Sequence, residues 1–143
     1  MGEKRKFRVR EASWSADREA LQDLRYRVFV IEQKVPVELE WEEADASCLH
    51  ALALDESATP VGTGRLLADG QIGRMAVLPA WRHCGVGGAI LDFLLDQARQ
   101  RQMTVFLNAQ THALGFYERH GFVAEGDVFM DAGIPHRRMT LSR

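Results

Sequence analysis

The sequence predicts an α+β domain, an α/β/α sandwich in which a mixed, mostly antiparallel sheet is flanked by helices. Short strand-like segments alternate with segments of helical periodicity along the whole chain. Asp69-Gly70 forms a hairpin signal between two of the strand-like segments, which indicates antiparallel pairing there. A strand–helix–strand unit follows and adds a parallel pair, so the sheet is expected to be mixed.

The first half of the chain combines one long helix with four strands. Residues 7–10 alternate charged and apolar side chains and are expected to form the first strand. Ser15 is the predicted N-cap of a helix that runs to about Glu32, before Val35-Pro36. Its apolar residues at helical spacing are Leu21, Leu24, Val28 and Ile31. An acidic stretch broken by Leu39 and Trp41 is expected to be loop or a short helix, and strands are expected over 48–54, 61–67 and 71–78.

The second half begins with a glycine-rich loop after Pro79 and a long helix over about 85–102. The apolar face of this helix is wide enough to pack on a sheet; it comprises Ile90, Leu91, Leu94, Leu95 and Ala98. A strand over 104–109 precedes a helix over 113–120, which Gly121 ends in a left-handed conformation. Phe122 begins another strand, 137–141 form the last one, and residues 1–143 are expected to make a single domain.

Composition excludes several classes of protein. The formal net charge of −2 gives no bulk attraction to nucleic acid or to an anionic membrane. Cys48 and Cys84 form no CxxC pair, and no histidines cluster at ligand spacing, so neither a disulfide framework nor a metal site is expected. The chain has no apolar run of about 18 residues, no signal-peptide pattern at its start, and Lys6 where myristoylation after Gly2 needs Ser or Thr. We therefore expect a cytoplasmic protein without nucleic-acid or membrane partners.

The loop from Val77 to Gly88 is the most informative segment. A strand enters it, a helix leaves it, and a helix N-terminus offers unpaired N–H groups to phosphate. Its spacing is Arg82-x-x-Gly85-x-Gly87. A P-loop would need Lys-Ser/Thr after Gly88, and a dinucleotide fingerprint would need Gly at position 90, where Ile stands. The glycines alone are also compatible with a tight turn that binds nothing.

Three segments in register resemble the GNAT N-acetyltransferase superfamily. Gly73–Val77 resembles the fourth strand of that family, Arg82–Gly88 its acyl-CoA loop, and Ala113–Phe122 its helix with the pattern A-x-x-x-Y-x-x-x-G-F. Arg25–Gln33 and Gly133–His136 further resemble an ElaA-like branch. The resemblance implies an acyl-CoA N-acyltransferase fold. It also implies an N-acetyltransferase that moves acetyl from acetyl-CoA to an amine by direct transfer in a ternary complex.

The same resemblance assigns roles to individual residues. The backbone N–H of Val77 would stabilise the oxyanion, and Tyr117 would be the general acid for the leaving thiolate. The residues expected to contact coenzyme A are Met75, Ala76, Val77, Arg82, His83, Cys84, Gly85, Val86, Gly87, Gly88, Asn108, Gln110 and Tyr117. Relatives carry Asn about four residues before the Ala of the helix pattern. Here Gln110 lies three before it with Asn108 nearby, so either amide could contact the cofactor.

The general base is assigned less directly. Glu32, His112 and His136 are candidates, and each also has an ordinary structural interpretation as a surface or hydrogen-bonded residue. His136 is preferred because Gly133-Ile-Pro135 would hold it rigidly in a loop before the last strand. Cys84 is interpreted as a small space-filling residue rather than a nucleophile. The acidic residues Glu38, Glu40, Glu42, Glu43 and Asp45 would form a solvated face or attract a cationic amine.

Two other functions share some of these features. A non-catalytic acyl-CoA-binding or sensing module would keep the loop, and an intact Tyr117 favours the enzyme. A nucleotide-binding regulatory domain is disfavoured because the Lys-Ser/Thr pair is missing. The acceptor stays open between a small polyamine, an aminoglycoside-like molecule, an amino acid and a protein N-terminus, and so does assembly into a homodimer.

Overall fold

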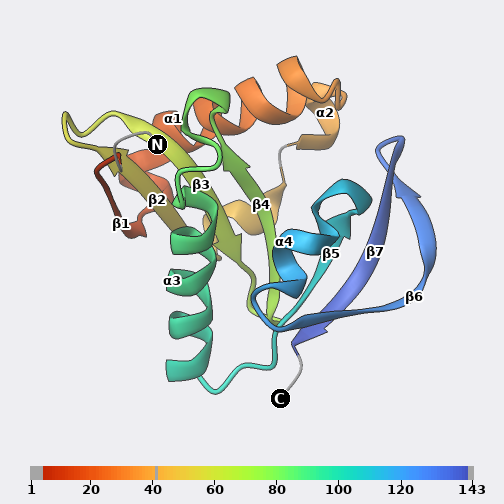
Figure 1. Ribbon diagram of the computed structural model, residues 1–143. Helices are drawn as coiled ribbons and strands as arrows, with labels where there is room; N and C mark the ends of the chain where they lie inside the picture. Colours follow the sequence, from red (N-terminus) through yellow and green to blue (C-terminus); the bar gives the residue numbers. More distant parts are fainter. Residues whose placement is uncertain (1–4, 41, 142–143) are drawn as a thin grey trace.

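The structure is a computed structural model that describes residues 5–40 and 42–141, with backbone alone at 39 and 40. One sheet has the strand order β1-β2-β3-β4-β5-β7-β6, with α3 and α4 on one face and α1 on the other (Figure 1). Its strands are β1 Phe7–Ala12, β2 Leu49–Asp55, β3 Pro60–Leu66, β4 Gln71–Val77, β5 Phe106–Gln110, β6 Phe122–Asp131 and β7 Ile134–Leu141. The main helices are α1 Trp14–Arg25, η1 Tyr26–Glu32, α2 Val37–Glu40, α3 Val86–Gln100 and α4 Leu114–Glu118. Short 3₁₀ segments are η2 Glu43–Ala46, η3 Pro79–Trp81 and η4 Thr111–Ala113.

The pairing confirms the predicted mixed, mostly antiparallel sheet. Strands β1 to β4 pair antiparallel in chain order, and β7 pairs antiparallel with both β5 and β6. The parallel pairing of β4 with β5 is short: among the described residues it joins Gln71 to Phe106 and Ile72 to Leu107. Beyond these pairs the two strands diverge, which leaves a gap in the middle of the sheet.

The two faces of the sheet differ in side-chain size. In β2, Ala51 and Ala53 lie under α3, whereas Leu52 and Leu54 pack with the α1 residues of the opposite layer. Next to them, Gly62 and Gly64 of β3 allow α3 to approach closely. A Cβ on Gly62 would lie 2.9 Å from Ile90 Cδ1, and a Cβ on Gly64 2.9 Å from Ile90 Cγ2. These small residues set the height of α3 above the sheet, and therefore the position of its N-terminus.

The long first helix ends at Glu32, as predicted, but it begins earlier and its second half is not α-helical. Ser13, not Ser15, is the N-cap: its side chain accepts from the N–H of Ala16, and Trp14 packs against the apolar α1 cluster. From Tyr26 to Glu32 the helix is π-helical, which the periodicity of the apolar residues did not reveal. Such wide turns often occur at functional sites. This one ends beside the gap in the sheet.

Several boundaries near the gap also differ from the predictions. The predicted helix over 113–120 is a 3₁₀ turn followed by the short α4, although Gly121 has the expected left-handed φ of 93°. Strand β7 begins at Ile134 rather than at 137. His136 therefore lies within a strand, not in a loop, because β6 and β7 close in a two-residue turn at Ala132 and Gly133, both with positive φ.

The acidic stretch folds into α2 and η2, as the prediction of a short helix allowed. The side chains of Leu39 and Glu40, and Trp41 as a whole, lie outside the described residues. Among the helices that the structure describes, none combines the length and apolar character needed to cross a bilayer.

Candidate active site

The gap between β4 and β5 opens into a cavity of about 420 Å³. The residues that line it include Met75 of β4, Asn108 and Gln110 of β5, Tyr117 of α4 and His136 of β7. The end of η1 closes it with Phe29 and Gln33. The divergence of one parallel strand pair thus brings together side chains that are far apart in the sequence.

The edge of β4 that faces β5 presents backbone groups to this gap. Leu78 donates its N–H to Val61 of β3 at 3.0 Å, and successive residues of a strand point to opposite edges. The N–H and C=O of Val77 therefore face away from β3, toward β5. The Nε of Arg82 donates to the carbonyl of Val77 at 2.9 Å, which agrees with this direction. Ala76 points its side chain into the core with Val28 and Phe29 instead.

A bulge lies in β4 next to the cavity. The register with β3 shifts by one residue between Thr63 and Arg65, and Arg74 has a φ of 51°. A non-glycine residue with positive φ is uncommon and occurs often at functional sites. The extra residue bends β4 and contributes to its separation from β5.

The loop before α3 has the shape of an anion site. His83 and Gly85 both have left-handed φ angles, 63° and 89°, and Gly85 is the N-cap of α3. Among the described residues no side chain caps this end, and its first turn holds no acidic residue. The free N–H groups of this turn therefore form an uncompensated positive end of the helix dipole. Val86 is 1% exposed and offers only its backbone. The thiol of Cys84 donates to the carbonyl of Arg82 at 3.4 Å.

Gly87 and Gly88 serve packing as well as access. A Cβ on Gly87 would lie 3.5 Å from the ring of Phe116, and a Cβ on Gly88 3.4 Å from the ring of His120. Gly87 therefore faces α4 and Gly88 the residues just after it, whereas a Cβ on Gly85 would meet none of the described atoms within 4 Å. The close contact between α3 and α4 places the N-terminus of α3 next to the helix that carries Tyr117.

Arg82 and Glu32, predicted to have separate roles, bind each other. The two terminal nitrogens of Arg82 donate to the two carboxylate oxygens of Glu32 at 2.7 and 2.6 Å. The hydrogen bond from Arg82 lowers the pKa of Glu32 and raises the pKa of Arg82. Glu32 is therefore a weaker base than an ordinary glutamate.

Tyr117 is buried between two aromatic rings, Phe116 at 4.9 Å and Phe122 at 6.0 Å, both edge-on. Burial raises its pKa to about 12. The phenol is therefore neutral at physiological pH.

Two histidines reach the cavity, each with one ring nitrogen engaged. Gln33 accepts from the amide of Gln110 at 2.9 Å, and the amide oxygen of Gln110 lies 2.6 Å from Nε2 of His112. His136 donates its Nδ1–H to the carbonyl of Ile134 at 2.7 Å and stacks on Phe129. In neutral His136 the lone pair is consequently on Nε2. Asn108 is exposed and lines the same cavity, so both candidate amides lie at the site.

The acidic segment contains a buried charge network that sequence reasoning missed. Asp45 accepts from Arg25 at 2.8 Å and from Arg65 at 2.6 Å, and Glu42 pairs with Arg65 and Arg74. Asp45 is therefore neither part of a solvated face nor accessible to a cationic amine, whereas Glu38 and Glu43 are exposed. An arginine at position 65, as the one charged residue of its strand, was the available signal.

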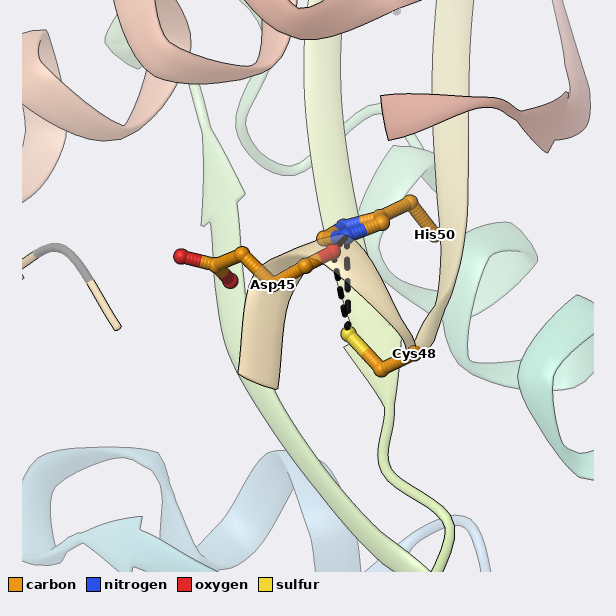
Figure 2. A group of neighbouring side chains, drawn as sticks. All are labelled: Asp45, Cys48 and His50. Atoms are coloured by element: carbon orange, nitrogen blue, oxygen red, sulfur yellow. Dashed lines mark hydrogen bonds between the residues drawn. The ribbon is translucent and has the colours of Figure 1, made fainter. Parts of the chain in front are cut away.

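Asp45, Cys48 and His50 lie close enough to suggest a metal site, which the sequence did not predict. Figure 2 shows that the carboxylate of Asp45 points away from the other two side chains. Nε2 of His50 contacts the backbone carbonyl of Asp45 at 2.8 Å and the thiol of Cys48 at 3.4 Å. Burial raises the pKa of Cys48, which disfavours the thiolate that a metal needs. With its carboxylate taken by arginines, this trio is a hydrogen-bonded structural cluster.

Comparison with known proteins agrees with this geometry. The sequence model of the acetyltransferase (GNAT) domain matches residues 15–143. The chain is 42% identical over 121 residues to the uncharacterized N-acetyltransferase YjcF of Bacillus subtilis, covering 81% of this chain and 86% of that protein. It is 30% identical over 125 residues to ElaA of Escherichia coli, covering 82% of each.

Solved structures show the same likeness. The crystal structure of Escherichia coli ElaA superposes with a TM-score of 0.85 at 26% identity, covering 96% of this chain and all of that one. An acyl-CoA N-acyltransferase from Pseudomonas aeruginosa superposes with a TM-score of 0.84 at 29% identity and the same coverage. The chain therefore belongs to the GNAT acetyltransferase family, in a branch that includes ElaA, whose fold binds acyl-CoA and whose members transfer acyl groups to amines.

Proposed function

We propose that this protein is an N-acetyltransferase that moves acetyl from acetyl-CoA to an amine directly, in a ternary complex. One observation carries the proposal: β4 and β5 diverge so that the edge groups of Val77 face an open gap beside the uncapped N-terminus of α3. The N–H groups from His83 to Gly88 would hold the pyrophosphate. Met75, Asn108 and Gln110 line the adjoining cavity and would contact the acyl-bearing arm.

The chemistry needs a base, an oxyanion donor and an acid. The amine nitrogen forms a bond to the thioester carbon, its proton passes to Nε2 of His136, and the carbonyl oxygen accepts from the N–H of Val77. The carbon–sulfur bond then breaks, and the thiolate takes the proton of Tyr117. His112 is a second candidate base, and Glu32 a third whose lowered pKa makes it less basic. These residues supply all three functions, so the mechanism calls for no metal.

The acceptor is a small-molecule or peptide amine. A cavity of about 420 Å³ is at the lower end of the range for ligand pockets and favours a small molecule or a chain end over a folded surface. We propose the cytoplasm as the site of action, where acetyl-CoA and reduced thiols occur together.

Calorimetry with acetyl-CoA and CoA, with ATP and NAD as controls, tests the cofactor. Micromolar binding of the CoA compounds with no heat from the controls is the expected result. An amine screen that detects release of the CoA thiol then tests turnover. No CoA binding would refute the proposal, and tight binding without turnover for any amine would favour the sensing module.

Replacing Tyr117 with Phe tests the acid. The substitution keeps the ring that packs between Phe116 and Phe122 and removes only the donor. We expect kcat to fall about 100-fold while the Kd for CoA is unchanged. A fall in kcat that is accompanied by a comparable loss of folding stability would instead mean that Tyr117 is a core residue.

Replacing His136 with Gln tests the base, and His112→Gln is its matched control because both rings line the same cavity. We expect kcat/KM of His136→Gln to fall by about two to four orders of magnitude, with a much smaller loss for His112→Gln. The reverse order in steady-state kinetics would transfer the role of base to His112.

A further inference from the structure

Arg82 connects the loop before α3 to two other parts of the site. Its Nε–H donates to the carbonyl of Val77 at the end of β4, and its terminal nitrogens hold both carboxylate oxygens of Glu32 at the end of η1. Glu32 and Arg82 are 50 residues apart in the chain. All three nitrogens of the guanidinium thus donate to groups of the protein itself, the carbonyl of Val77 and the carboxylate of Glu32.

The contact with Val77 bears directly on the proposed oxyanion donor. In an extended strand the N–H and C=O of one residue point to the same edge, so the carbonyl of Val77 lies beside its N–H. An uncovered carbonyl there would repel a developing oxyanion through its lone pairs. The Nε–H of Arg82 engages this carbonyl and places a cation next to it. The bond also restrains the Val77–Leu78 peptide plane, which adjoins the plane that carries the Val77 N–H.

We propose that Arg82 is a positioning residue for the oxyanion site at Val77, held in place by Glu32, rather than a ligand of the pyrophosphate. The inference rests on the proposed function. The loop can supply its own phosphate donors, because no described side chain caps the N-terminus of α3 and its backbone N–H groups are free there. Glu32 orients the guanidinium through its two hydrogen bonds, in the way that a hydrogen-bonded carboxylate orients a metal-binding histidine in many sites.

Arg82→Met tests this inference with two measurements on acetyl-CoA labelled with ¹³C at the carbonyl. Calorimetry gives its Kd, and difference infrared spectroscopy of the saturated complex gives the carbonyl stretching frequency, which reports polarisation without any acceptor. In the wild type we expect a frequency below that of free acetyl-CoA. In Arg82→Met we expect the frequency to return toward the free value while the Kd stays within about threefold, with kcat lowered about 10- to 100-fold.

Matched variants separate the explanations. Arg99→Met removes an exposed arginine at the far end of α3 and should change neither quantity. Glu32→Gln should shift the frequency part of the way, because one oxygen still accepts from Arg82. A Kd raised tenfold or more in Arg82→Met, with an unchanged frequency at saturation, would overturn the inference and return Arg82 to the phosphate. Failure of the wild type to bind acetyl-CoA would refute the proposed function itself, which is a distinct outcome.

Discussion

Two arginine–carboxylate pairs of similar geometry lie in different parts of the molecule. Arg25 and Asp45 bind at 2.8 Å with side chains 1% and 2% exposed, whereas Arg82 and Glu32 bind at 2.6 Å with side chains 34% and 39% exposed. Each arginine uses both terminal nitrogens against both carboxylate oxygens. On geometry alone, the two ion pairs would be expected to be equally strong.

Because the two pairs differ in burial, they differ in their contribution to the free energy of unfolding. A charge left alone in the interior keeps its full desolvation cost, so removing one partner of a buried pair is strongly destabilising. Exposed partners return to water, and such a pair contributes little to the free energy of unfolding. We therefore expect the pair at Asp45 to contribute strongly to the stability of the fold. We expect the pair at Glu32 to contribute little to stability.

Asp45→Asn should produce the largest effect. The substitution removes the carboxylate charge that the buried guanidinium groups of Arg25 and Arg65 share, while Arg65 keeps its ion pair with Glu42. We expect a loss of about 3–5 kcal/mol in the free energy of unfolding, measured by urea denaturation. Asp96→Asn, at an exposed pair on α3, is the control and should cost less than about 1 kcal/mol. A similar small loss for Asp45→Asn would remove the distinction between the two regions.

Lowering the pH should reproduce part of this loss in the free energy of unfolding. Burial by itself would raise the pKa of Asp45, but the hydrogen bonds and charges of Arg25 and Arg65 outweigh it and hold the pKa below its ordinary value. The stabilisation is therefore present above the unfolded pKa of about 3.9 and is lost as pH falls through the lower folded pKa. The difference in unfolding free energy between wild type and Asp45→Asn should shrink below about pH 4. A difference that stays constant down to pH 2 would contradict this origin.

Glu32→Gln should have the smallest effect on stability. Its partner Arg82 is about one-third exposed and regains water, so we expect the free energy of unfolding to change by less than about 1 kcal/mol. The change should vanish in 1 M salt, where exposed charges are screened. Urea denaturation at two salt concentrations measures both values. A loss above about 2 kcal/mol would mean that this pair also maintains the fold.

Local signals were sufficient for most of the fold. The apolar periodicity placed α1 and α3 within a few residues, and Asp69-Gly70 and Gly121 adopt the turn conformations that their residue types favour. The segments that resembled the family lie around the β4–β5 gap. Boundaries failed where tertiary contacts override propensity, as at Ser13, which became the cap because Trp14 packs into the α1 cluster.

The sequence by itself determined the family, the mixed sheet and the glycine-rich loop, because each depends on residues that are neighbours in the chain. Only the tertiary structure decided which polar side chains meet: Glu32 with Arg82, Gln33 with Gln110, and Asp45 with two arginines. These pairs join residues 20 to 77 positions apart. Long polar side chains bind whichever partner the folded backbone brings within about 3 Å, and no local pattern encodes that distance.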